Sequence, residues 1–144
     1  MIKNQGGKAM VVIICVENRN GILFNHRRVS RDTAVLQRIA ENSKKPVLIS
    51  PFSATLFKDF SNVLICENPL DEAKDGDICF IEDMDIVPYL DKISKIILYH
   101  WNRDYPADTF LPEIEKYGWK SDKIFEFQGK SHEKITEEEF TYEK

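Results

Sequence analysis

Short apolar runs recur along the chain and alternate with polar segments, which is the pattern of a layered α/β protein. The first run covers residues 10–16, and four more follow at 46–49, 63–66, 78–81 and 96–99. Each run is continuous in apolar character and rich in β-branched residues, as in strands that are buried on both faces of a parallel sheet. The spacing therefore predicts five parallel strands.

Helical segments are predicted between these strands. Val35, Leu36, Ile39 and Ala40 recur every three or four residues and form one apolar stripe. Ser30 is expected to cap this helix, with Asp32 in its first turn, where a carboxylate suits the helix dipole. Shorter helices are predicted at 52–57 and at 85–91, the second with Pro88 in its first turn.

The C-terminal part changes its pattern. Residues 123–127 and 139–142 alternate polar and apolar side chains, as antiparallel or edge strands do. The acidic run 137–139 is interpreted as the solvated start of a strand. The predicted fold is thus α/β: a mostly parallel central sheet with helices on both faces and a C-terminal antiparallel hairpin. Residues 1–8 are expected to be disordered or tag-like, and residues 9–144 to form a single domain.

Composition and charge exclude several classes of function. The chain has 144 residues, 42% of them hydrophobic, and a formal net charge of −4. This charge disfavours nucleic-acid binding, which needs a basic surplus or a basic face. The longest apolar run, 9–16, is far shorter than the roughly 20 residues of a membrane span. No secretory signal is evident at the N-terminus, so we expect a cytoplasmic protein without a membrane partner.

Cysteine and histidine residues are few and scattered. Cys15, Cys66 and Cys79 each lie in an apolar stretch and are interpreted as buried hydrophobic residues, the alternatives being a disulfide or a nucleophile. His26, His100 and His132 lie far apart, and no paired metal-ligand spacing occurs, so no metal is expected. His132 is interpreted as a surface-loop residue. His100 either belongs to the core or lines a cleft together with Trp101.

Several segments in order resemble dihydrofolate reductase. They are 79–81, 93–100 and 107–114, the last reading Ala-Asp-Thr-Phe-Leu-Pro-Glu-Ile. Asn20-Gly21-Ile22 and Lys45-Pro46-Val47 stand where that family has Gly-Ile and Lys-Pro-Val, and residues 119–120 and 140–144 resemble its closing hairpin. The resemblance covers most of the chain. It implies a dihydrofolate reductase-like fold, with NADPH as cofactor, a pterin-like substrate and Asp108-Thr109 as a brace for the active-site loop.

The resemblance implies one catalytic group and several substrate-binding residues. Asp32 stands where the family has the acid that hydrogen-bonds and polarises the pterin. The alternative is an ordinary carboxylate at a helix start. Leu36 and Tyr99 fall at substrate-binding positions, although Tyr99 replaces a threonine and would crowd a pterin.

The positions that would hold the cofactor are altered. Glu82 and Asp83 replace two adjacent glycines whose joint peptide is cis in the family, and a cis bond between such residues costs about 3 kcal/mol. Their carboxylates would also repel a diphosphate. Ile86 replaces an aromatic residue near the nicotinamide. Residues 50–53, which end at Ser53, stand where the family binds the cofactor phosphate, but their sequence differs from the family's phosphate-binding one. NADPH binding is therefore expected to be impaired.

The loop before the first helix is basic. His26, Arg27, Arg28 and Arg31 lie close together in sequence, and arginine forks suit phosphate or carboxylate groups. We hypothesise that His26, Arg27 and Arg28 receive an anionic small molecule, the alternative being a solvated basic loop.

Two functions remain open at the sequence level. The first is an NADPH-dependent reductase of a pterin-like or related heterocycle. The second is a catalytically inactive relative that binds an anionic or heterocyclic small molecule or a protein partner. The intact Asp32 and Asp108-Thr109 favour the first, and Glu82-Asp83 favours the second.

Overall fold

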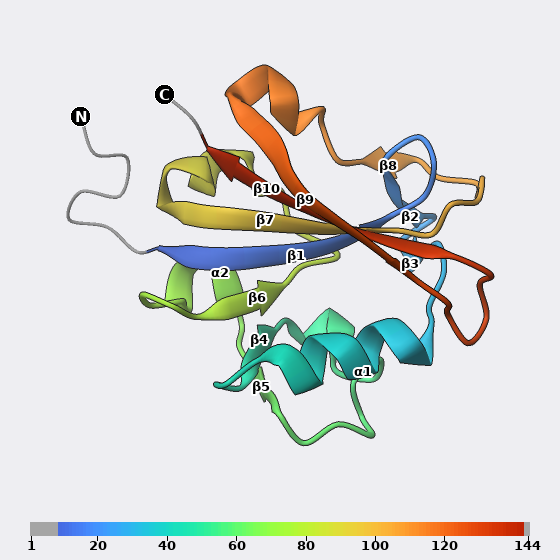
Figure 1. Ribbon diagram of the computed structural model, residues 1–144. Coiled ribbons are helices and arrows are strands. Elements are labelled where there is room, and N and C mark those ends of the chain that lie inside the picture. Colours follow the sequence, from blue (N-terminus) through green and yellow to red (C-terminus); the bar gives the residue numbers. More distant parts are fainter. Residues whose placement is uncertain (1–8, 143–144) are drawn as a thin grey trace.

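A seven-stranded sheet forms the centre of the protein (Figure 1). The computed structural model describes residues 9–142, so the prediction for residues 1–8 lies outside the described part. The strand order is β5-β4-β6-β1-β7-β10-β9. The strands are β1 (Met10–Val16), β4 (Val47–Ile49), β5 (Val63–Ile65), β6 (Ile78–Phe80), β7 (Ile93–His100), β9 (Trp119–Phe127) and β10 (Ile135–Tyr142).

The pairing directions match the sequence pattern. β1 pairs in parallel with β6 and β7, and β4 pairs in parallel with β5 and β6. β10 pairs antiparallel with β7 and with the edge strand β9. The predicted fold class, a mostly parallel sheet with a C-terminal antiparallel hairpin, is confirmed.

Both faces of the central strands are buried, which explains their continuous apolar runs. The edge strand β5 differs from the prediction, because its Leu64 and Ile65 side chains are exposed. Val12 and Ile14 of β1 face a cluster that includes Leu70 and Ile114, from segments that follow other strands. Ile13 faces the opposite cluster with Val35 and Leu36 of α1 (Thr33–Asn42). The first face is covered by α2 (Pro69–Glu72) and by two 3₁₀ turns, η2 (Val87–Lys92) and η3 (Ile114–Tyr117). Alternate residues of β1 thus pack into two hydrophobic clusters, one on each face of the sheet.

Local structure differs from the predictions at three places. The helix predicted at 85–91 is the 3₁₀ turn η2, and the segment predicted as a helix at 52–57 contains only the 3₁₀ turn η1 (Pro51–Ser53) followed by turns. Asp32, not Ser30, is the N-cap of α1: its backbone is extended and its side chain accepts a hydrogen bond from the Ala34 amide. A residue expected inside the helix therefore lies just before it.

The basic loop takes part in a second, small sheet. Its strands are β3 (Arg27–Arg28), β2 (Gly21–Phe24) and β8 (Thr109–Phe110), in that order. Leu23 pairs with Arg28 in the register of the β2–β3 hairpin. The Asp108 carboxylate accepts a hydrogen bond from the Asn25 amide at 3.0 Å and so holds the turn of this hairpin. The segment predicted as a surface loop is therefore ordered, and it fixes the direction of Arg28.

Within residues 9–142, none of the helices combines the length and the apolar character that crossing a bilayer requires.

Candidate functional site

Three of the predicted site residues meet where β4 and β6 end. Glu82 follows β6, Ser53 lies in η1 after β4, and Arg28 reaches them from the β2–β3 hairpin. The Arg28 guanidinium donates to both oxygens of Glu82, through Nε at 2.8 Å and Nη2 at 2.9 Å. The Ser53 hydroxyl donates to Glu82 Oε1 at 2.7 Å. We call Arg28, Ser53 and Glu82 the corner cluster.

The polar groups of the corner cluster form most of their hydrogen bonds with one another. The hydrogen bond from Arg28 to Glu82, and the attraction between the two charges, raise the pKa of Arg28 against the opposing effect of burial. Arg28 also donates to the Phe52 carbonyl and lies over the Phe52 ring. Because Glu82 already neutralises this guanidinium, Arg28 has little charge left for an anionic ligand.

Asp83, the second residue of the turn, is exposed. Its carboxylate accepts a hydrogen bond from the Ser50 hydroxyl at 3.1 Å. Every peptide bond among residues 9–142 is trans, including the one that joins Glu82 to Asp83. The two acidic residues therefore differ: Glu82 is a buried ion-pair partner, whereas the Asp83 charge faces solvent.

A cleft of about 500 Å³ opens beside this turn. Ile86, buried at the start of η2, is part of its wall. Its lining is mainly apolar, with carboxylates from one segment and a threonine from another. The residues are Ile22, Leu23, Glu82, Asp83, Met84, Asp85, Ile86, Val87, Thr109, Phe110, Leu111, Pro112 and Tyr117. Three of the four predicted cofactor positions therefore face one cleft.

Asp32 is buried and accepts four hydrogen bonds. Its Oδ1 accepts from the amides of Ala34 and Lys130, each at 2.9 Å. Its Oδ2 accepts from the Ser131 amide at 2.7 Å and contacts His132 Nδ1 at 2.9 Å. Asp32 thereby joins the start of α1 to the loop between β9 and β10.

The electrostatics of Asp32 follow from these contacts. Burial alone would raise the pKa of this carboxyl, but the hydrogen bonds from His132, Lys130, Ser131 and Ala34 together lower it below its ordinary value. The side chain is 1% exposed. Asp32 is thus a buried anion that is stabilised by donors from the chain itself.

Leu36 and Tyr99, which were predicted to bind substrate, lie in the core between α1 and the sheet. Leu36 is buried in the cluster that α1 forms with the strands. The Tyr99 hydroxyl donates to Glu137 Oε1 at 2.8 Å, and burial followed by the Glu137 charge raises the pKa of Tyr99. Glu137 is also paired with Arg38 of α1. Glu137 is therefore buried and paired, which corrects the prediction that residues 137–139 are solvated.

The tip of the hairpin is open to solvent. His26 has a positive φ of 63° and is exposed, as is Arg27. Arg27 and Arg28 line a shallow groove of about 280 Å³ together with Phe24, Asn25, Val29 and Pro106. The basic residues predicted to act together are thus split: Arg28 points to Glu82, while His26 and Arg27 remain at the surface.

Cys15, in β1, lies near the same carboxylates. Burial raises the pKa of its thiol, and the charges of Glu82 and Asp32 raise it further against the opposing effect of Arg28. Cys15, Cys66 and Cys79 are all free thiols. The disulfide alternative does not apply to them.

Sequence reasoning missed the role of His132. This residue is 4% exposed, not at the surface, and its ring stacks on Trp101 with centroids 4.7 Å apart. Its Nε2 lies 3.0 Å from both the Ser30 and the Tyr105 hydroxyl oxygens. His132 stands one hundred positions from Asp32 in the sequence, so no local spacing could have indicated this contact.

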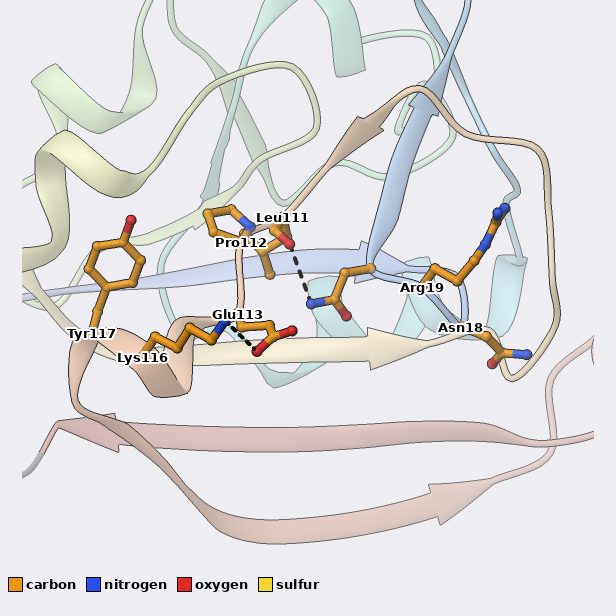
Figure 2. A pocket seen from close by; sticks show the side chains of 8 residues that line it. Asn18, Arg19, Leu111, Pro112, Glu113, Lys116 and Tyr117 are labelled. Atoms are coloured by element: carbon orange, nitrogen blue, oxygen red, sulfur yellow. Dashed lines mark hydrogen bonds and ion pairs between the residues drawn. The ribbon is translucent and has the colours of Figure 1, made fainter.

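A second hollow, of about 590 Å³, lies between the β1–β2 turn and the segment around η3 (Figure 2). Its charged side chains are exposed, and Lys116 pairs with Glu113 at 3.4 Å. The Asn20 side-chain amide donates to the Leu111 carbonyl at 3.3 Å. None of the predicted site residues lines this hollow, and its basic groups are paired within the chain, Arg19 with Glu17 and Lys116 with Glu113.

Across residues 9–142, no group of three or more His, Cys, Asp or Glu side chains converges in a way that could hold a metal ion.

Comparisons with known proteins support the fold. No protein-family model matches the chain, and no curated protein matches it either. Among solved structures, dihydrofolate reductase from Enterococcus faecalis, complexed with NADP(H) and RAB-propyl, superposes with a TM-score of 0.69. The two chains are 8% identical, and the match covers 94% of this chain and 97% of that one. The protein described here therefore has the dihydrofolate reductase-like fold that its sequence predicts.

Proposed function

We propose that this protein is a dihydrofolate reductase-like binding protein that takes a heterocyclic small molecule in the cleft beside Glu82. The observation that carries the proposal is the corner cluster next to the cleft. There Arg28 and Ser53 donate three hydrogen bonds to Glu82, so the turn after β6 is held by side chains of the chain itself.

The shape and lining of the cleft suit a flat ring system. Its volume of about 500 Å³ lies within the range of small-molecule sites. Phe110 and Met84 offer apolar surface, and Asp83 and Asp85 offer acceptors. A carboxylate has about four lone-pair directions, and one hydrogen bond to each of these groups leaves others available. A pterin, with its ring N–H and amino donors, combines these requirements.

The same lining opposes a dinucleotide. Two exposed carboxylates, Asp83 and Asp85, border the cleft, and each would repel a diphosphate by about 1 kcal/mol even when fully screened by water. The nearby Arg28 is already paired. A neutral or cationic heterocycle meets no such repulsion.

Ligand-dependent stabilisation tests this proposal. Pterin added at rising concentration is expected to raise the Tm of the protein, whereas NADPH at equal concentration gives a smaller shift. The double variant Asp83→Asn/Asp85→Asn is expected to weaken the pterin effect at least several-fold. Asp59→Asn, an exposed change outside the cleft, should leave it unchanged. A Tm that pterin does not move in the unaltered protein would refute the proposal.

An NADPH-dependent reductase is the second candidate. It is favoured by the buried, ionised Asp32 at the start of α1 and by the likeness to a reductase that was solved with NADP(H). If this candidate holds, NADPH quenches the fluorescence of Trp101 or Trp119 and is oxidised in the presence of dihydropterin. Under our account of the altered turn, Glu82→Gly/Asp83→Gly strengthens NADPH binding. Unchanged binding in that variant would show that the two acidic residues are not the obstacle.

A further inference from the structure

We infer that Ser30, His132 and Asp32 form a nucleophile, a base and a positioning group for acyl transfer from small carboxylic esters. This inference concerns a different site from the cleft beside Glu82 and does not depend on ligand binding there. It stands on three contacts between residues from three loops: Asp32 Oδ2 to His132 Nδ1 at 2.9 Å, and His132 Nε2 to the Ser30 and Tyr105 hydroxyls at 3.0 Å each.

The hydrogen-bond network defines the roles. Because the ionised Asp32 carboxylate can only accept, the proton between the two groups is on His132 Nδ1. In the neutral imidazole, Nε2 then carries a lone pair that faces the Ser30 and Tyr105 hydroxyls alike, each at 3.0 Å. This is the arrangement in which a base activates a nucleophile and is oriented by a third group.

The base is rigidly held. The His132 ring stacks on Trp101 and meets the Tyr105 ring edge-on, with centroids 6.2 Å apart. The Asp32 carboxylate is in turn fixed by the amides of Lys130 and Ser131. Contacts from three side chains, Trp101, Tyr105 and Asp32, thus hold the imidazole in place. The nucleophile candidate Ser30 is half-buried.

A second hydroxyl lies beside this group. The Ser30 hydroxyl donates to the Tyr105 hydroxyl oxygen at 3.3 Å, so Ser30, Tyr105 and His132 Nε2 form one hydrogen-bond network.

A groove lies beside the residues that precede Ser30 and follow Tyr105. It is formed by residues that include Val29 and Pro106, the sequence neighbours of Ser30 and Tyr105. Its volume of about 280 Å³ is at the lower end of ligand sites, which restricts the substrate to small esters.

The chemical steps balance without a cofactor. Ser30 Oγ bonds to the ester carbonyl carbon as its proton passes to His132 Nε2. The carbon–alkoxide bond then breaks, and the alcohol leaves with that proton. Water attacks the acyl-Ser30 ester and gives a proton to His132, which returns it to Ser30 Oγ as the carboxylic acid departs.

An alkyl fluorophosphonate tests the nucleophile directly on the full chain. The reagent forms a bond between Ser30 Oγ and phosphorus with loss of fluoride, and peptide mass spectrometry locates the adduct. We expect labelling on Ser30 that is absent in Ser30→Ala and slowed about a hundredfold or more in His132→Gln. Ser121→Ala, at an exposed serine of β9 outside this group, should label like the unaltered protein.

Further readouts separate catalysis from a merely structural role. Hydrolysis of p-nitrophenyl acetate is expected to fall to the uncatalysed rate in Ser30→Ala, while circular dichroism and Tm stay unchanged. If His132→Gln does not fold, the rise of the labelling rate of the unaltered protein with pH reports the base instead. Folded protein that is not labelled at Ser30, or that is labelled equally in His132→Gln, would overturn the inference.

Discussion

Arg28 donates two hydrogen bonds to Glu82, from Nε to Oε2 at 2.8 Å and from Nη2 to Oε1 at 2.9 Å. The two residues are 54 positions apart, and the contact ties the β2–β3 hairpin to the turn after β6. Both side chains are mostly hidden from solvent, at 21% and 9% exposure. The pair therefore holds the small sheet against the large one at the place where the resemblance implies a cofactor.

Removal of this cation should destabilise the protein. Arg28→Ala leaves the Glu82 charge buried with only the Ser53 hydroxyl as side-chain partner, and we expect a loss of about 2–4 kcal/mol in the free energy of unfolding. Urea denaturation measures it. Arg27→Ala, the exposed neighbour, should change stability by less than about 0.5 kcal/mol.

The charge on Glu82 is the reason for that loss. The double variant Arg28→Ala/Glu82→Gln should therefore recover part of it, because no unpaired charge remains. Equal stability of Arg28→Ala and Arg27→Ala would contradict this account of the ion pair.

Stability should depend on Asp32 in acid. Because the folded-state pKa of Asp32 is lower than the ordinary value of about 3.9, its contribution is complete above about pH 5. It is lost as the pH falls through the folded-state pKa. Asp32→Asn should flatten the curve of unfolding free energy against pH below about pH 5. Denaturation at a series of pH values checks this, and parallel curves for the two proteins would exclude it.

Gly129 must stay without a side chain. A Cβ at this position would lie 2.5 Å from Asp32 Oδ2 and 2.9 Å from the His132 carbonyl oxygen. Gly129→Ala is thus expected to cost about 1–3 kcal/mol. Asp32→Ser keeps a capping hydroxyl but shortens the side chain. In the Asp32→Ser protein, Gly129→Ala should therefore reduce the free energy of unfolding by less. Additive effects of the two changes would show that the clash is not with the carboxylate.

The Tyr99 hydroxyl provides a test of the core beneath α1. Tyr99→Phe removes the hydrogen bond to Glu137 and keeps the ring, so we expect a loss of about 1–2 kcal/mol. Arg38 still pairs with Glu137, which limits the loss. Tyr117→Phe, at a 46% exposed position, is the matched control for thermal unfolding. A Tyr99→Phe protein as stable as the control would argue against the contact.

The sheet was predictable because burial on both faces leaves a direct mark on the sequence. Residues 10–16 and 96–99 are continuous apolar runs, and the tail alternates, so strand direction could be inferred from local pattern. The helical segments around Pro51 and Pro88 were less predictable. Short apolar stretches with an early proline are compatible with both α-helix and 3₁₀ turns, and packing decides between them.

The polar contacts were not predictable from local pattern. Arg28 was expected to meet a ligand, and its partner Glu82 was expected to repel one, yet the fold pairs them with each other. His132 carries the sequence features of a surface loop, because its neighbours are polar, but the loop folds inward onto Asp32. Such pairings depend on topology, and topology brings together residues that share no sequence pattern.

The hundred-residue separation between Asp32 and His132 has a consequence for synthesis of the protein. On the ribosome, α1 emerges long before the β9–β10 loop, so its N-cap carboxylate remains hydrated while most of the polypeptide is translated. Only after the last strands leave the exit tunnel can the amides of Lys130 and Ser131 reach it. A nascent chain arrested before this loop would therefore display a helix N-terminus whose capping carboxylate has not yet met its partners.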